Sequence, residues 1–168
     1  PLVTAGTDPE DIWEGGGMYP FSTTDDIISL ASSSASDTET ISVQGLDVDG
    51  NLVNQDIILQ GTTRVALDTP LWRVFRLENE GANDLVGTVF CYTGTGTVPL
   101  IGDPEVRAVI LGDQNQTQMA IYTVPKGKVG FLQRGELGME FAGSLGAGTN
   151  FARCTYRSRR PEGVFKVK

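Results

Sequence analysis

The chain has 168 residues, 39% of them hydrophobic, which is enough to bury the core of one domain. It contains 21 Gly and 8 Pro but no His. The lack of His removes the commonest general base and neutral metal ligand, together with every Ser-His or Cys-His nucleophile pair. We therefore expect a protein that is not an enzyme, with no catalytic residues, no cofactor and no metal ligands.

The net charge of −8 is unevenly distributed along the chain. Residues 1–84 carry 15 acidic and 3 basic side chains, whereas residues 85–168 carry 6 acidic and 10 basic ones. Such polarity can steer copies or partners into head-to-tail contact. The alternative is a solvated acidic surface with a few basic groups near the C-terminus.

Residues 1–40 are predicted to form an extended arm followed by the first strand. Three consecutive glycines, Gly15 to Gly17, separate Trp13 from Tyr19 and Phe21. These aromatic residues are apolar anchors on a flexible backbone. Two interpretations stay open: the anchors insert into a neighbouring subunit, or they pack on their own domain.

Short apolar runs with alternating residues predict a series of strands. The first covers residues 27–31, and a β-hairpin follows over residues 41–59. Asp49, Gly50 and Asn51 form the hairpin turn, where Gly tolerates a positive φ. A mixed strand is predicted around residues 71–76 and another at residues 86–92.

The next part of the chain is the most regular. We predict long loops at residues 93–105 and 112–118, and strands at residues 106–111, 119–124 and 129–133. The tight turn between the last two strands comprises Pro125 to Lys128, because Pro presets the backbone and Gly127 gives freedom after it.

Near the C-terminus a strand is predicted to carry arginines on one face. Arg153, Arg157 and Arg159 alternate there with uncharged residues. A last short strand includes Val164 and Val167. Together with Trp13, Tyr19 and Phe21, the three arginines are the candidate assembly contacts; internal pairing with Glu136 or Glu140 is the alternative.

Two cysteines, Cys91 and Cys154, are too few for a disulfide scaffold. Both lie in predicted strands, which favours buried free thiols over a single bridge. No apolar run approaches the ~20 residues that a membrane-spanning helix needs.

About ten or eleven strands without a credible helix predict an all-β protein. The expected architecture is a jelly-roll-like antiparallel β-sandwich with an extended N-terminal arm. The arm and first strand would occupy residues 1–40 and the sandwich domain residues 41–168. The exposed edges of such a sheet need covering within the subunit or by a neighbour.

Several motifs that resemble ligand sites have simpler explanations. Asp47, Asp49 and Asn51 have the spacing of calcium ligands, yet Ile58 stands where an EF-hand loop has its closing Glu. The Gly-Thr run after residue 92 lacks the helix and Lys of a phosphate loop. Carboxylate pairs of a glycosidase depend on a separation that sequence spacing does not give. The acidic net charge opposes nucleic-acid binding.

In chain order, DIWEGGGMYPF, ISVQGLDVDGNLVNQDIILQGTTRVAL, WRVFRLEN and NQTQMAIYTVPKGKVGFL, followed by an Arg-rich strand, resemble segments of small structural proteins of tailed, podovirus-like bacteriophages. The resemblance covers most of the chain. It implies a β-sandwich virion component that has no enzymatic activity and is present in many copies. The implied location is the virion, after assembly in the host bacterial cytoplasm.

Among virion roles, small size and an arm suited to clamping neighbours favour a capsid decoration or cement protein that stabilises the head shell. The alternative is a tail or head-fibre adhesin module that binds host surface glycan. The expected partners are the major capsid protein, other virion proteins and further copies of the chain. The family resemblance suggests a trimer, and we expect neither a nucleic-acid nor a membrane partner.

Overall fold

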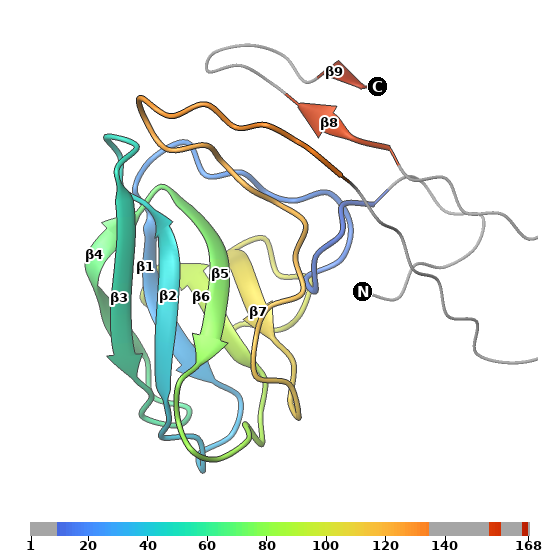
Figure 1. Ribbon diagram of the computed structural model, residues 1–168. Helices are drawn as coiled ribbons and strands as arrows, with labels where there is room; N and C mark the ends of the chain where they lie inside the picture. The colour runs from blue at the N-terminus through green and yellow to red at the C-terminus, as the bar shows by residue number, and fades with distance from the viewer. Residues whose placement is uncertain (1–9, 135–154, 159–165, 168) are drawn as a thin grey trace, which may run out of the picture. The chain divides into compact units, whose positions relative to one another are not determined.

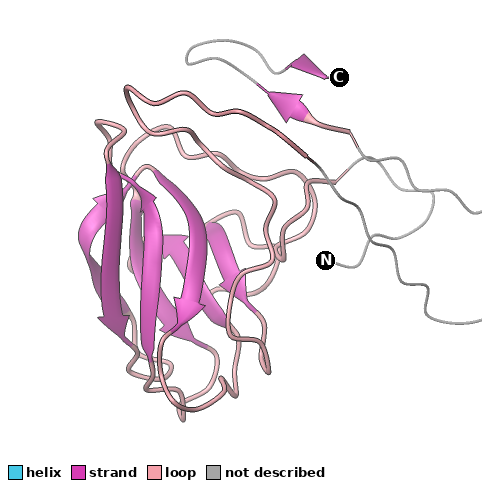
Figure 2. Ribbon diagram, in the orientation of Figure 1, coloured by secondary structure: helices cyan, strands magenta, loops and turns pink. Residues whose placement is uncertain are grey.

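The computed structural model describes residues 10–134, 155–158 and 166–167. In that part of the chain the ordered elements are nine β-strands, with no helix (Figures 1 and 2). Accordingly, none of these residues forms a helix that could cross a membrane. The chain divides into two compact units, residues 1–129 and 130–168, which are described separately.

Seven of the strands belong to the first unit. They are β1 (Ile27–Ser32), β2 (Thr40–Leu46), β3 (Leu52–Ile58), β4 (Val65–Leu71), β5 (Arg73–Asn79), β6 (Val89–Thr93) and β7 (Val106–Ile110).

The seven strands form two antiparallel sheets. The four-stranded sheet has the order β4-β1-β6-β7 and the three-stranded sheet the order β3-β2-β5. Figure 1 shows the sheets as two layers. The predicted all-β class and antiparallel sandwich are confirmed. A jelly roll has eight strands in two Greek keys, so that finer designation stays a prediction, as does the N-terminal arm.

The predicted hairpin is confirmed, with β2 and β3 paired without interruption from Thr40 and Ile58 to Leu46 and Leu52. In its turn Gly50 has a φ of 80°, in the left-handed region that favours glycine. The Asp47 carboxylate accepts hydrogen bonds from the backbone and side-chain nitrogens of Asn51, at 2.8 and 2.9 Å. These bonds lower the Asp47 pKa and close the turn.

The single strand predicted around residues 71–76 is wrong. The chain bends at Trp72, so that β4 belongs to the four-stranded sheet and β5 to the three-stranded one. The Trp72 backbone N–H donates to Leu46 O across 2.8 Å and fixes this change of sheet. Apolar residues on both sides of the bend concealed it, since each of the two strands buries its own inward face.

The main core lies between the sheets. Its buried members come from every strand of the first unit and from the connections, as in β2 with Ile41 and Val43 and β5 with Val74 and Leu77. Cys91 of β6 belongs to the same cluster as a buried free thiol, which confirms that part of the cysteine prediction. Burial raises its pKa to about 12.

A second buried cluster covers the other face of the four-stranded sheet. Along β6, Val89 and Cys91 belong to the main core, whereas Phe90 and Tyr92 belong to the second cluster. Because alternate residues of a strand point to opposite faces, this sheet is buried on both sides. Trp13 and Tyr19 of the N-terminal segment supply the cover.

The free edge of β5 is paired by a loop. Asn79 N donates to Asn115 O at 2.8 Å, and Thr117 N donates to Leu77 O at 3.0 Å. Beyond that point, the strands predicted at residues 119–124 and 129–133 are wrong, because neither segment joins a strand ladder in the described chain. The turn between them does form, with Lys128 N donating to Pro125 O at 3.1 Å.

In the second unit, β8 (Arg157–Ser158) pairs antiparallel with β9 (Lys166–Val167). These two strands coincide with parts of the predicted Arg-rich and C-terminal strands. Arg153, Cys154, Arg159 and Val164 lie outside the described residues.

Candidate binding face

The outer face of the three-stranded sheet carries polar residues in all three strands, with the exposed apolar side chains of Leu52 and Ile58 at the ends of β3. The inward residues of β2 are apolar, while Ser42 and Gln44 between them face outward. The strand register aligns these outward residues in two rows. One row contains Asp56, Ser42 and Glu78, and the other contains Asn54, Gln44 and Arg76. We call these six residues the polar face.

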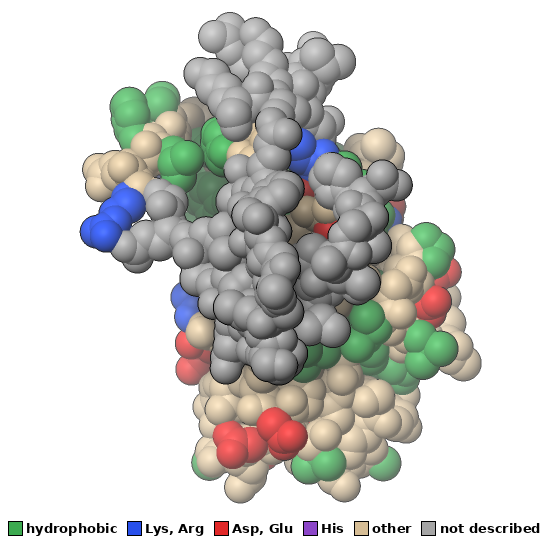
Figure 3. All heavy atoms as spheres, turned by 90° about the vertical axis from the view of Figure 1, so that its right-hand side faces the viewer, with side chains coloured by type: hydrophobic (Ala, Val, Ile, Leu, Met, Phe, Trp, Pro, Cys, Tyr) green, Lys and Arg blue, Asp and Glu red, His purple; other side chains and the backbone are tan. Residues whose placement is uncertain are grey.

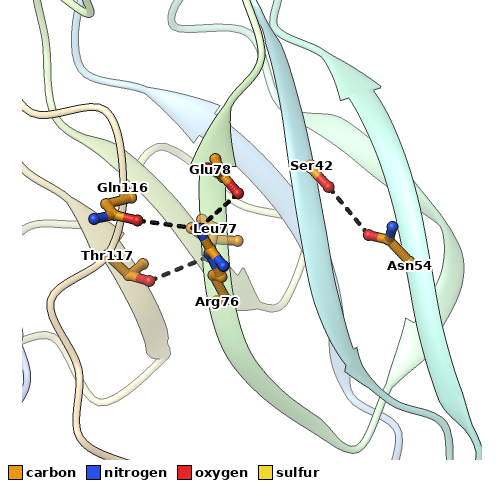
Figure 4. Close-up of polar contacts among 7 residues, drawn as sticks. All are labelled: Ser42, Asn54, Arg76, Leu77, Glu78, Gln116 and Thr117. Atoms are coloured by element: carbon orange, nitrogen blue, oxygen red, sulfur yellow. Dashed lines mark hydrogen bonds and ion pairs between the residues drawn. The ribbon is translucent and has the colours of Figure 1, made fainter.

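Hydrogen bonds and one ion pair hold several of these side chains in place (Figure 4). Ser42 Oγ donates to Asn54 Oδ1 at 3.0 Å. The Arg76 guanidinium lies 2.8 Å from the Glu78 carboxylate and donates to Gln116 Oε1 at 3.1 Å. Arg76 therefore connects the polar face to the loop that pairs with the edge of β5.

At this edge the surface is hollowed. The hollow has a volume of about 370 Å³, and its lining contains five amide side chains and one carboxylate, those of Glu78, Asn79, Gln114, Asn115, Gln116 and Gln118. Besides Gln116, two of the amides are fixed by hydrogen bonds. Asn79 Nδ2 donates to Asn83 O at 2.8 Å and to Asn115 Oδ1 at 3.0 Å, and Asn115 Nδ2 donates to Asp84 Oδ1 at 2.9 Å.

A β-bulge places an aromatic residue beside the polar face. Gly45 pairs with Val74 and the preceding Gln44 with Arg76, so Phe75 is the extra residue of β5. Its ring centroid lies 4.9 Å from that of Tyr122, at an interplanar angle of 58°. Tyr122 is 63% exposed, so the pair presents aromatic surface to solvent.

The aromatic residues predicted as assembly contacts lie on their own sandwich. Trp13 and Tyr19 are only 2% and 5% exposed, and Phe21 packs beside them. The Trp13 and Tyr19 rings meet edge to face at 5.0 Å. Gly16 and Gly17, with φ of 71° and 63°, form a turn in which Trp13 Nε1 donates to Gly17 O at 3.3 Å. The glycines thus seat the indole on the chain's own sheet, in line with the second interpretation.

Two buried arginines attach the same segment to the sandwich. Arg107 donates from Nε to Ser22 Oγ at 2.8 Å, and Arg73 donates to Ser22 O. The Arg73 guanidinium also lies over the Trp72 ring, 3.8 Å from its centroid, and 5.4 Å from that of Phe21. Arg107 stands in an otherwise apolar strand, whereas the strand of Arg73 also carries Arg76 and Glu78, so the sequence pattern did not distinguish Arg73 from a surface arginine.

Of the arginines predicted as assembly contacts, Arg157 alone is described. It is half-buried in β8 of the second unit. Within the described ranges, no group of three or more Cys, Asp or Glu residues has the geometry to hold a metal ion.

Apolar side chains are exposed on the segment around the Pro125–Lys128 turn. Val124 and Val129 are 40% and 76% exposed in the first unit, and Phe131 and Leu132 at the start of the second unit are 83% and 66% exposed. On the side of the molecule seen in Figure 3, the described surface is mostly uncharged and polar, with apolar groups in small clusters. The sequence signalled this segment, but as paired strands.

The chain matches no family model, no curated protein and no solved structure.

Proposed function

We propose that the chain is a non-enzymatic structural protein of a tailed bacteriophage virion, most closely a decoration protein that stabilises the head shell. The proposal rests on the phage-like sequence segments together with one structural observation. Around the Pro125–Lys128 turn, the chain has the residue pattern of two strands and yet forms no ladder in the described part of the chain. The apolar side chains of Val124 and Val129, on either side of the turn, are exposed to solvent.

An extended segment that joins no strand ladder in the described chain and has alternating apolar residues is suited to strand addition on a partner. Ala120 N and Lys126 N already donate to Ile12 O and Gly50 O, so the remaining backbone groups would make the new bonds. Residues 119–124 already have a strand's alternation, with Met119 and Ile121 partly buried on the second cluster and Val124 exposed. Pairing with a capsid protein or with another copy would bury Val124 and Val129. Each fully buried apolar side chain contributes about 1.5–3 kcal/mol, so burial of Val124 and Val129 would add to the hydrogen bonds of the new strand pairing.

In this account the partner surface differs from the one that the sequence suggested. Trp13 and Tyr19 stabilise the sandwich, and the segment around Pro125–Lys128 makes the contact. The terminal strands β3 and β7 have a strand neighbour on one side only in the described chain, which favours a homo-oligomer on the virion, and a trimer remains our proposal for its stoichiometry.

Rebinding of the purified chain to phage heads that lack it tests the proposal. We expect the wild-type chain to bind and the double variant Val124→Asp/Val129→Asp to bind at least tenfold more weakly, because a buried carboxylate without a partner is costly. Val86→Asp is the matched control, since Val86 is 69% exposed in another part of the first unit. Failure of the wild-type chain to bind heads would overturn the proposal. If the double variant binds as tightly as Val86→Asp, the segment around Pro125–Lys128 is not the contact surface.

A further inference from the structure

We infer that the amide-lined hollow at the β5 edge, together with the adjoining polar face, binds a neutral saccharide. This inference does not depend on the assembly role. The residues that line the hollow, Glu78, Asn79 and members of 114–118, lie outside the segment from residue 119 onward that the assembly proposal uses, and either proposal can fail without the other.

The chemistry of the lining fits sugar hydroxyl groups. An amide side chain offers a donor and an acceptor side by side, which matches two neighbouring hydroxyl groups. The bond from Arg76 uses the carbonyl oxygen of Gln116, and among the described residues the Gln116 NH₂ group has no acceptor and can serve a ligand. Gln118 lines the same hollow, and its side chain makes no hydrogen bond within the described residues.

Gln114 also belongs to the lining, but its side-chain oxygen lies below the surface of the hollow. Gln114 Oε1 is buried without a hydrogen-bond partner among the described groups, which costs free energy in a folded protein. The loop that carries it is fixed by two backbone bonds, from Asp113 N to Leu85 O at 3.0 Å and from Gln114 N to Leu111 O at 3.1 Å. Asp113 itself adopts a positive φ of 63°. These backbone bonds hold the amide groups of the lining in place before a ligand binds, which lowers the entropic cost of binding.

The size and the aromatic border of the site agree with this ligand class. The hollow is open to solvent, so with a volume of about 370 Å³ it would hold a saccharide at the surface rather than enclose it. Phe75 precedes Arg76 in β5, and Arg76 reaches Gln116 of the lining. Phe75 belongs to the strand that carries Glu78 and Asn79 of the lining, and the Phe75 and Tyr122 pair offers exposed aromatic surface on which the apolar face of a sugar ring can pack.

Local charge selects a neutral saccharide over an acidic one. Glu78 lines the hollow, and Asp84 lies directly behind it, bonded to Asn115. The nearby cation, Arg76, is already paired with Glu78. An anionic sugar would meet carboxylates there and be repelled.

Isothermal titration with three probes tests the inference: maltohexaose, triacetylchitotriose and trigalacturonic acid. We expect at least one neutral probe to bind with a dissociation constant on the order of 1 mM, and the acidic probe to bind at least tenfold more weakly. Absence of binding by both neutral probes at 10-fold that concentration overturns the inference. Tighter binding of the acidic probe than of the neutral ones would contradict the charge argument and would also overturn the inference.

Variants then locate the site. Gln116→Ala and Gln118→Ala should each weaken binding at least fivefold, with unchanged circular dichroism. Gln60→Ala is the matched control, because Gln60 is an exposed glutamine outside the hollow and should leave affinity unchanged. Unchanged affinity in both hollow variants would show that the saccharide binds elsewhere and overturn the assignment.

Discussion

Glu14 is a buried carboxyl group of the N-terminal segment, and its ionisation makes the stability of the fold depend on pH. Its side chain is 8% exposed, and one carboxylate oxygen accepts a hydrogen bond from Gln118 N. The other oxygen, Oε2, is buried without a partner among the described residues. Loss of hydration outweighs the hydrogen bond, so burial raises the pKa of Glu14 above its usual 4.5.

Replacement of this carboxyl by an amide should therefore change the pH dependence of stability. A group with a raised folded-state pKa stabilises the fold below its unfolded pKa, and this contribution is lost as pH rises through the folded pKa. Glu14→Gln keeps an acceptor for Gln118 N but does not ionise. We expect urea unfolding to show the variant gaining stability over wild type between pH 4 and pH 7. A constant difference across that range would contradict the assignment.

Trp13 shows the stabilising role of the same segment. Its indole is 2% exposed against the sheet. Trp13→Ala should lower the free energy of unfolding by about 3–5 kcal/mol, as other large-to-small core changes do, and lower the melting temperature measured by calorimetry. Leu100→Ala is the control, because Leu100 is exposed and should change stability by less than about 0.5 kcal/mol. An unchanged melting temperature in Trp13→Ala would restore the intersubunit interpretation of this residue.

Among the structural elements, the edges of the two sheets are protected by different devices. A loop pairs with β5, whereas β4 carries Pro70, a residue confined to edge strands and bulges. Gln55 of β3 then bonds to both backbone groups of Thr69 in β4. Its Nε2 donates to Thr69 O, and its Oε1 accepts from Thr69 N, each at 2.9 Å. One side chain thus replaces a strand partner at this edge.

Gln55→Met tests this device, since Met has a similar shape but forms neither bond. The change leaves both Thr69 groups unpaired, and we expect a loss of about 1–3 kcal/mol in chemical denaturation. Gln60→Met, at an exposed position, should cost little. If Gln55→Met leaves the free energy of unfolding unchanged, water satisfies the backbone groups of Thr69 and Gln55 does not stabilise this edge.

Strand prediction from the sequence succeeded where alternation and turn chemistry agreed. The β2–β3 hairpin has both, and the structure reproduces it. It failed at residues 119–124, where the alternation is real but the backbone has no strand to pair with in the described chain. Periodicity reports which side chains face the core, whereas pairing depends on neighbours that are distant in sequence. The bend at Trp72 was missed for the same reason.

The candidate site was less predictable than the fold. Asn79, Gln114 and Gln116 occur in polar stretches that look like ordinary loop sequence, and only the pairing of the loop with β5 brings them together. The position of Trp13 did have a signal. Phe90, Tyr92 and Val109 make β6 and β7 apolar on both faces, which indicates a sheet covered on both sides. The aromatic N-terminal segment is a natural cover.

At the scale of the whole molecule, the sandwich leaves two different surfaces for contact. The polar face and its hollow are suited to a small hydroxylated ligand, and the apolar segment around Pro125–Lys128 is suited to a protein. The acidic first 84 residues and the basic remainder would further orient copies on a particle, through attraction that weakens with salt.

The most direct test of the virion role is the composition of purified phage particles. Quantitative mass spectrometry of intact particles, and of separated heads and tails, gives the location and copy number of the chain. We expect hundreds of copies per particle, all in the head fraction, as a decoration protein on a symmetric shell requires. A few copies confined to the tail would favour the adhesin alternative. Absence from purified particles, with the chain abundant in the infected cell, would contradict the account.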